Sequence, residues 1–164
     1  MPRDAKPTQP IQRQRLELAS LVLEVVSSYA EQLERRDIEV DLDVPQNLWV
    51  EIDNVLMREA FRKLIDNAIE AMLGGGCLTI TSLISRSNLE IEFADTGCGV
   101  SDELKERLFE PFSTTKHDHA GLGLSMVRDI VGSHEGTIVV DDCPEGGTAF
   151  TLCMPVRNVS RQAA

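Results

Sequence analysis

A strong helical pattern followed directly by two alternating segments constrains the fold of this chain more than any other feature. Apolar side chains recur at three- and four-residue spacing, which predicts an amphipathic helix from Asp53 or Asn54 to Leu73. They are Leu56, Ala60, Phe61, Leu64, Ala68 and Met72. Asp53 can cap the start of this helix, and the three glycines at 74–76 can end it. Residues 78–84 and 89–94 then alternate apolar and polar positions around a polar turn, which predicts a β-hairpin.

The remaining patterns predict further elements of the same two kinds. They are a helix from about Arg15 to Arg36, strands at 37–43 and 48–52, a short helix from Ser101, a loop at 109–120, a helix at about 122–133, and strands at 137–141 and 148–154. We therefore expect an α+β fold, a two-layer α/β sandwich whose mixed, mostly antiparallel sheet carries its helices on one face. The expected domain occupies residues 13–156, between a linker at 1–12 and a C-terminal tail at 157–164.

The charge of the chain excludes one class of binding. With 27 acidic and 16 basic residues its formal net charge is −11, so it has no general basic field for a nucleic-acid backbone. An anion must then be held locally, by backbone amides, a few cations or a metal. No apolar run approaches the roughly 20 residues that span a bilayer, and the polar, proline-rich start is not a signal peptide. The four cysteines lack zinc spacing and are interpreted as free thiols in a reducing compartment.

Asp95 is the first candidate functional residue. Strict alternation along residues 89–95 places its carboxylate on the same side as Leu89, Ile91 and Phe93. A carboxylate on the apolar side costs free energy unless a group there pairs with it. Two glycines, Gly97 and Gly99, follow at once and allow a backbone or a ligand to approach closely. The alternative is an ordinary turn in which Asp95 caps the next helix.

Three other segments are ambiguous when taken singly. Asn67 lies on a polar stripe of the second helix, which most simply is a solvated face, although its amide oxygen suits Mg²⁺. Gly121 and Gly123 open a helix whose first amides could bind an anion, but a short glycine turn is more often structural. The segment 145–148 by itself is an ordinary hairpin turn.

Taken in order along the chain, these segments resemble the sequence boxes of the sensor histidine kinases. Residues 63–71 resemble the asparagine box, 95–99 the first glycine box, 108–116 the phenylalanine box, 121–124 the second glycine box and 146–148 the last glycine box. The match covers roughly residues 15–156. It resembles the ATP-binding catalytic domain of two-component histidine kinases, within the wider group of gyrase and heat-shock chaperone ATPases. The form of residues 112–116 and the short gap to the second glycine box look most like the nitrogen-regulation branch.

The resemblance implies the Bergerat ATP-binding fold, with ATP and Mg²⁺ as ligands. The nucleotide-binding residues that it implies are Asn67, Asp95, Gly97, Gly99, Phe112, Thr115, Lys116, Gly121, Leu122, Gly123 and Thr148. Asp95 would accept from the adenine amino group, Gly97 and Gly99 would line the adenine pocket, and Thr148 would reach the same edge through water. Asn67 would hold the metal, and Asn67 and Lys116 would be the catalytic residues. Positioning and charge neutralisation carry the rate of phosphoryl transfer, so few acids and bases are needed.

Two positions depart from the family pattern. Lys63 stands where histidine kinases often have a second asparagine and where the ATP-hydrolysing relatives typically have a glutamate that activates water. A lysine cannot act as that base at neutral pH, which argues against a hydrolase. His119 and Ala120 stand where glycine and threonine are common before the second glycine box.

The histidines indicate what this chain does not contain. The family phosphorylates a histidine on a helical dimerisation hairpin. His117 and His119 instead lie in the lid that the resemblance implies, the loop from about Ser113 to Ala120, and His134 lies at a helix-to-strand turn, where we expect a structural role. The resemblance thus implies a domain that binds Mg·ATP and donates the γ-phosphate to a phosphoacceptor domain absent from this chain.

The implied partners are that phosphoacceptor domain and, through it, a response regulator, with no nucleic acid involved. We expect the isolated domain to be a cytoplasmic monomer that does not autophosphorylate and its parent to be a homodimer. The alternatives are an anti-sigma-type serine/threonine kinase and a nucleotide-binding interaction module without transfer activity.

Overall fold

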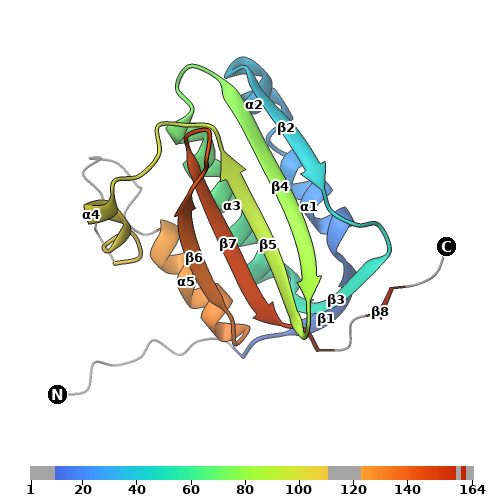
Figure 1. The fold of residues 1–164 in the computed structure, drawn as a ribbon. Helices are drawn as coiled ribbons and strands as arrows, with labels where there is room; N and C mark the ends of the chain where they lie inside the picture. Colours follow the sequence, from blue (N-terminus) through green and yellow to red (C-terminus); the bar gives the residue numbers. More distant parts are fainter. Residues whose placement is uncertain (1–9, 111–122, 158–159, 162–164) are drawn as a thin grey trace.

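Five strands form the main sheet of the computed structural model, which describes residues 10–110, 123–157 and 160–161 (Figure 1). In spatial order they are β2 (Ile38–Asp43), β4 (Gly76–Ser85), β5 (Asn88–Asp95), β7 (Thr148–Pro155) and β6 (Thr137–Asp142). Helices α1 (Leu18–Ser27), α3 (Asn54–Ala71) and α5 (Gly123–Ser133) cover one face of this sheet (Figure 1). This is the predicted two-layer α/β sandwich.

The strand pairing explains why the sheet is mixed. Strands β4 and β5 form the predicted hairpin, and β5–β7 and β7–β6 are also antiparallel. Only β2 and β4 are parallel among these pairs, since the chain between them passes through a strand and the long helix α3. Parallel neighbours require such a crossover, whereas antiparallel neighbours can be joined by a tight turn.

The prediction of one helix over residues 15–36 was wrong at its start and in its middle. Residues Arg13–Glu17 form strand β1, which pairs antiparallel with β3 (Leu48–Asp53), and α1 begins only at Leu18. A break at residues 28–29 then separates α1 from the short helix α2 (Ala30–Arg35). Strand β3 also pairs with β8 (Ser160–Arg161), which completes a small second sheet that no sequence pattern predicted. Pairing between segments over 30 residues apart leaves no local periodicity, and this is why it was missed.

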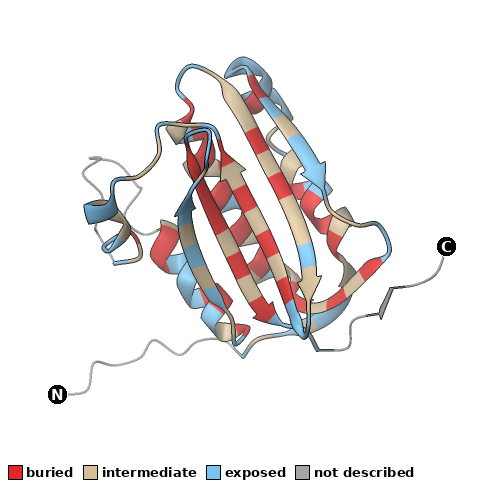
Figure 2. Ribbon diagram, in the orientation of Figure 1, coloured by how far each residue is buried: buried red, intermediate tan, exposed pale blue. Residues whose placement is uncertain are grey.

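The core lies between the main sheet and the helices, with α3 at its centre. The buried residues of α3 are Met57, Ala60, Phe61, Leu64, Ile65, Ala68 and Ile69. They pack on alternating buried positions of the strands, visible as red segments along β4 and β5 (Figure 2). The rings of Phe61 and Phe93 lie 5.3 Å apart between centroids and so connect the two layers. Strand β5 alternates strictly, and its inward set ends on Asp95.

The predicted cap of α3 is confirmed. The carboxylate of Asp53 accepts hydrogen bonds from the backbone N–H groups of Val55 and Leu56, both at 3.1 Å. It also accepts one at 2.8 Å from the N–H of Gln12, where the chain enters the fold. Burial is the largest single effect on the pKa of Asp53 and raises it, but the three hydrogen bonds together outweigh burial, so the pKa lies below its usual value. A helix cap of this kind stabilises a protein by about 1 kcal/mol.

His134 has the structural role that its position predicted. It is 3% exposed, its Nε2 accepts the backbone N–H of Asp53 at 3.0 Å, and its Nδ1 lies 2.8 Å from the carbonyl oxygen of Ile130. Because a carbonyl can only accept, Nδ1 carries the proton and the ring is neutral. The ring therefore joins the last turn of α5 to the start of α3. Burial lowers the pKa of His134 below its usual value.

We expect the fold to lose stability as the pH falls from about 7.5 to about 5.5, because His134 has an unfolded pKa of about 6.5 and a lower folded one. The unfolded chain then binds more protons than the folded one, and a protonated Nε2 cannot accept from Asp53. Urea unfolding of the wild type and of His134→Gln at both pH values measures this contribution. The wild type should lose more stability between the two pH values than the variant, and an equal loss would contradict the role assigned to this ring.

Candidate functional site

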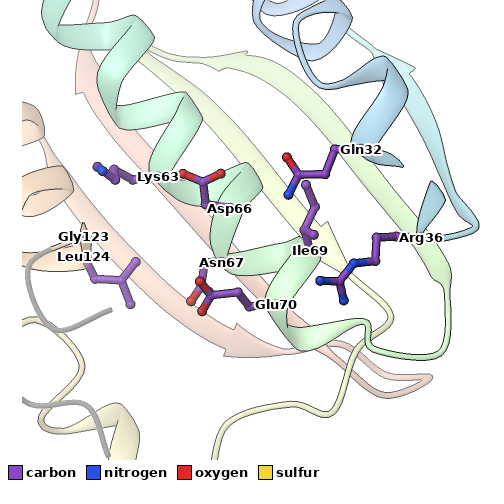
Figure 3. Close-up of a pocket in the computed structure, with 9 residues that line it drawn as sticks. All are labelled: Gln32, Arg36, Lys63, Asp66, Asn67, Ile69, Glu70, Gly123 and Leu124. Atoms are coloured by element: carbon purple, nitrogen blue, oxygen red, sulfur yellow. The ribbon is translucent and has the colours of Figure 1, made fainter. Parts of the chain in front are cut away.

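A cavity of about 290 Å³ lies over α3, between α2 and the start of α5 (Figure 3). Its lining residues are Gln32, Arg36, Lys63, Asp66, Asn67, Ile69, Glu70, Gly123 and Leu124. Two residues predicted for the site, Asn67 and Gly123, thus meet in one cavity although they are 56 positions apart in sequence. The polar stripe of α3, which periodicity alone suggested to be a solvated face, is the floor of this cavity.

The position of the stripe follows from the burial of the opposite face of α3. Residues three and four apart share one side of a helix, so Lys63, Asn67 and Glu70 lie in a row while Leu64 and Ala68 face the core. Lys63, Asp66 and Asn67 are all half-buried. The floor of the cavity therefore combines a cation, a neutral amide and two carboxylates, with Glu70 at its exposed end.

Asp95 is buried at the end of β5, as the alternation predicted. It is 2% exposed, and its Oδ1 accepts the backbone N–H of Gly97 at 2.8 Å and that of Thr148 at 3.4 Å. Burial raises the pKa of Asp95, and the two amide hydrogen bonds act in the opposite direction. Both of these bonds use Oδ1, and within the part of the chain that the structure describes no donor is placed on Oδ2, which can accept a further hydrogen bond. Asp95 caps its own loop and not the next helix.

The loop after Asp95 is pressed against the end of α3. A Cβ atom at Gly97 would stand 2.6 Å from the carbonyl oxygen of Ala71, so only glycine fits there. The same carbonyl accepts the N–H of Cys98 at 3.1 Å. Ala71 follows Asn67 by four residues, about 6 Å along the helix axis. The loop after Asp95 therefore contacts α3 one turn beyond Asn67, which lines the cavity.

Gly147 makes a contact whose importance the sequence did not reveal. With φ of +97°, it crosses Asp95 so closely that an added Cβ would lie 1.9 Å from the Asp95 carbonyl oxygen. The turn before β7 is thereby packed on the end of β5. Gly99, predicted for the same pocket as Gly97, lines a separate hollow of about 450 Å³ together with Gly147 and Cys143. Gly97 and Gly99 thus face different neighbours.

Two cavity residues could not have been found from the sequence. Gln32 and Arg36 belong to α2 and its C-terminal end, and they face the cavity only because α2 packs beside α3 (Figure 3). Neither lies in a motif, and an exposed glutamine or arginine on a short helix carries no signal by itself.

Five of the predicted binding residues lie outside the described residues. They are Phe112, Thr115, Lys116, Gly121 and Leu122. The expected lid histidines, His117 and His119, lie there as well. Phe109, the first residue of the loop expected at 109–120, is described and is half-buried against the hydrophobic core.

The donor set of the cavity fits a magnesium ion that is shared with a ligand. Within the ranges that the structure describes, no group of three or more histidine, cysteine or carboxylate side chains is placed to hold a metal alone. Mg²⁺ is usually held by one or two protein oxygens together with substrate phosphates and water. The amide of Asn67, flanked by the carboxylates of Asp66 and Glu70 in the cavity lining, offers such oxygens.

Residues 52–158 match the sequence profile of the family described as histidine kinase-, DNA gyrase B- and HSP90-like ATPase. The chain belongs to this ATPase family. Among curated relatives, the adaptive-response sensory kinase SasA of Gloeothece citriformis is 33% identical over 153 residues, covering 89% of this chain and 39% of the relative. Sporulation kinase A of Bacillus subtilis is 32% identical over 152 residues, covering 92% of this chain and 25% of the relative. The chain therefore spans well under half the length of these ATPase-family relatives.

Solved structures of histidine kinases share the fold of this ATPase-family chain. The nucleotide-free catalytic domain of histidine kinase ThkA matches with a TM-score of 0.81 and 30% identity, over 88% of this chain and 97% of that domain. ThkA in complex with the response regulator protein TrrA matches with a TM-score of 0.80 and 28% identity, over 90% and 42% of the two chains. Within the described residues, no helix is both long and apolar enough to cross a membrane.

Proposed function

We propose that this chain is the catalytic domain of a sensor histidine kinase, which binds Mg·ATP and donates the γ-phosphate to a histidine on a phosphoacceptor domain outside this chain. The observation that carries the proposal is the buried carboxylate of Asp95, whose Oδ1 accepts two backbone N–H groups. The loop that follows it packs against Ala71, one helical turn after the cavity residue Asn67. Adenine offers an exocyclic amino donor of the kind that a carboxylate oxygen accepts.

The residues at the end of β5 and those of the cavity would bind different parts of the nucleotide. Asp95 would orient the adenine ring, because an ionised acceptor in a buried place makes a strong and directional hydrogen bond with an amino group. Gly97 allows the loop to pack against Ala71, so the adenine ring would lie beside the C-terminal turn of α3. The phosphates would then extend towards Asn67 and the first amides of α5, where the helix dipole favours negative charge.

The transfer step depends on orientation more than on acid–base chemistry. When bound, Mg²⁺ supplies positive charge to the phosphates, and Asn67 would hold it through its amide oxygen. Lys116 and Thr115, with the glycines at 121 and 123, complete the set of residues that we assign to the phosphates, and Phe112 is assigned to the lid. The reactive histidine approaches from the phosphoacceptor domain, so this chain needs no nucleophile of its own.

We propose the bounds of the domain, its branch of the family and its partners on the same basis. The domain proper is assigned to residues 13–156, and the form of residues 112–116 supports placement in the nitrogen-regulation branch. The proposed partners are the phosphoacceptor domain and, through it, a response regulator, in a homodimeric parent with its kinase domain in the cytoplasm. ThkA, which shares this fold, is known in complex with a response regulator protein. The solved structures described above are of a histidine kinase, which favours transfer to histidine over the anti-sigma-type reaction.

The isolated chain should bind a non-hydrolysable ATP analogue in the presence of Mg²⁺ but take up no radiolabel from ATP. It should place an acid-labile label on a histidine kinase dimerisation domain that is added separately. Acid lability distinguishes phosphohistidine from phosphoserine, so an acid-stable label on a partner would support the anti-sigma-type kinase instead. Binding without transfer to any acceptor would support the interaction module, and label on the chain itself would contradict the absence of an acceptor.

A further inference from the structure

We infer that Lys63 contacts the phosphates of the bound nucleotide at the start of α5. It does so from the position where histidine kinases often have a second asparagine. The inference rests on the proposed nucleotide site and specifies how this chain holds the anionic end of its ligand. It concerns a residue that the family pattern leaves without a role, because a lysine at this position departs from that pattern.

The position of Lys63 in the cavity is the first observation. Its side chain is 35% exposed and projects from the middle of α3 into the cavity, on the side of α5 (Figure 3). A Cβ atom at Gly123 would lie 3.6 Å from Cδ of Lys63, which is ordinary van der Waals contact. The aliphatic part of Lys63 therefore lies against the first residue of α5, and its ammonium is only two bonds beyond the contacting Cδ atom.

The charge at this place is the second observation. The first N–H groups of a helix have no partner within the helix and carry about half a positive elementary charge. A lysine beside them adds like charge, which is unfavourable by itself and becomes favourable when an anion lies between the two. Asn67, one turn further along α3, faces the same space. A phosphate group is the anion that this arrangement suits.

The ion pair made by Lys63 does not account for this position. Its ammonium lies 3.6 Å from Oε1 of Glu59, four residues earlier on the same helix. That distance is longer than a hydrogen bond, and both side chains are partly exposed. Pairs of this type stabilise a helix by about 0.3–0.5 kcal/mol, so a phosphate can readily displace the carboxylate.

The other charges of the cavity leave Lys63 as the cation nearest to α5. Among the described residues, the charged side chains of the lining are Arg36 and Lys63 against Asp66 and Glu70, two positive and two negative, which sum to zero. Arg36 and Gln32 lie on the α2 side of α3, opposite Gly123 and Leu124 (Figure 3). At the α5 end of this neutral lining, Lys63 is the nearest cation among the described lining residues.

The experiment compares Lys63→Met with Lys63→Arg and with Arg62→Met as the matched control. Arg62 is exposed, carries the same charge one residue earlier and does not line the cavity. Dissociation constants are measured in excess Mg²⁺ for a non-hydrolysable ATP analogue by calorimetry and for adenosine by chemical-shift titration. Since a charge-assisted hydrogen bond is lost, Lys63→Met should bind the analogue about ten- to a hundredfold more weakly.

Comparison of the ATP analogue with adenosine, which has no phosphates, distinguishes a phosphate contact of Lys63 from a structural role. Lys63→Met should leave the affinity for adenosine unchanged, Lys63→Arg should retain most of the affinity for the analogue, and Arg62→Met should match the wild type. Unchanged binding of the analogue by Lys63→Met would overturn the inference, as would an equal loss for analogue and adenosine or an equal loss in Arg62→Met. A wild type that binds neither ligand would instead refute the proposed function.

Discussion

Replacement of Asp95 by asparagine should weaken binding of an ATP analogue by at least about a hundredfold, since a charge-assisted bond worth about 1.5–3 kcal/mol is lost and a buried donor is left facing a donor. The amide oxygen of the variant can still accept from Gly97 and Thr148, which use Oδ1 in the wild type. The NH₂ group then takes the place of Oδ2 and opposes the amino group of adenine. Titration calorimetry measures the loss directly.

The same substitution should leave the fold at least as stable as the wild type. Burial raises the pKa of Asp95, which means that its ionised form is disfavoured in the folded protein and that a neutral amide avoids this cost. Glu90→Gln is the matched control, because Glu90 lies on the same strand but alternates to the opposite face. Thermal unfolding should show both variants folded, with only Asp95→Asn defective in binding. Full nucleotide affinity in folded Asp95→Asn would refute the adenine role of this residue.

Replacement of Gly147 by alanine should destabilise the fold by about 1–3 kcal/mol more than the same change at Gly146, because it forces a methyl group into a filled space. Both glycines have φ of +97°, so the cost of placing an L-residue in that conformation is shared. They differ in their surroundings. A Cβ at Gly147 would lie 1.9 Å from the carbonyl oxygen of Asp95, whereas a Cβ at Gly146 meets nothing within 4 Å.

Urea unfolding of the two alanine variants measures this difference without any ligand. Relief of the clash must separate the turn before β7 from the end of β5, and this would also shift the Thr148 N–H away from Asp95. We therefore expect Gly147→Ala to lose nucleotide affinity as well, while Gly146→Ala retains it. Equal unfolding free energies for the two variants would show that the close crossing at Gly147 is not a constraint in solution.

The helix–hairpin core of the fold was predictable because each part has a local pattern. Helix α3 and the β4–β5 hairpin carry periods of 3.6 and 2 that arise from contact with one apolar layer. The cap at Asp53 was equally local, since the acceptor and its donors are at most three residues apart. The failure at residues 13–17 has the opposite cause. Leu16 fits a helical stripe as well as a strand, and pairing with Val50 decides between them.

The candidate site was predictable to the extent that its residues stand in ordered motifs. The alternation of side chains along β5 indicates that Asp95 points inward, and the asparagine-box motif indicates Asn67. Alternation does not indicate which group a buried carboxylate contacts, so the sequence did not predict the hydrogen bond from the backbone N–H of Thr148, 53 residues away. Nor could the sequence assign Arg36 to the cavity, because only the packing of α2 beside α3 brings it there.

The sequence by itself determined the two layers, the inward direction of Asp95 and the family, because alternation, helical periodicity and motif order are properties of one chain read in order. Only the tertiary structure decided that the stripe of Lys63 and Asn67 is the floor of a cavity, that α5 begins against Lys63, and that Gly147 crosses Asp95. Each of these contacts joins segments that are far apart in the sequence. The covalent chain does not determine how close such segments come, and the close packing of the core does.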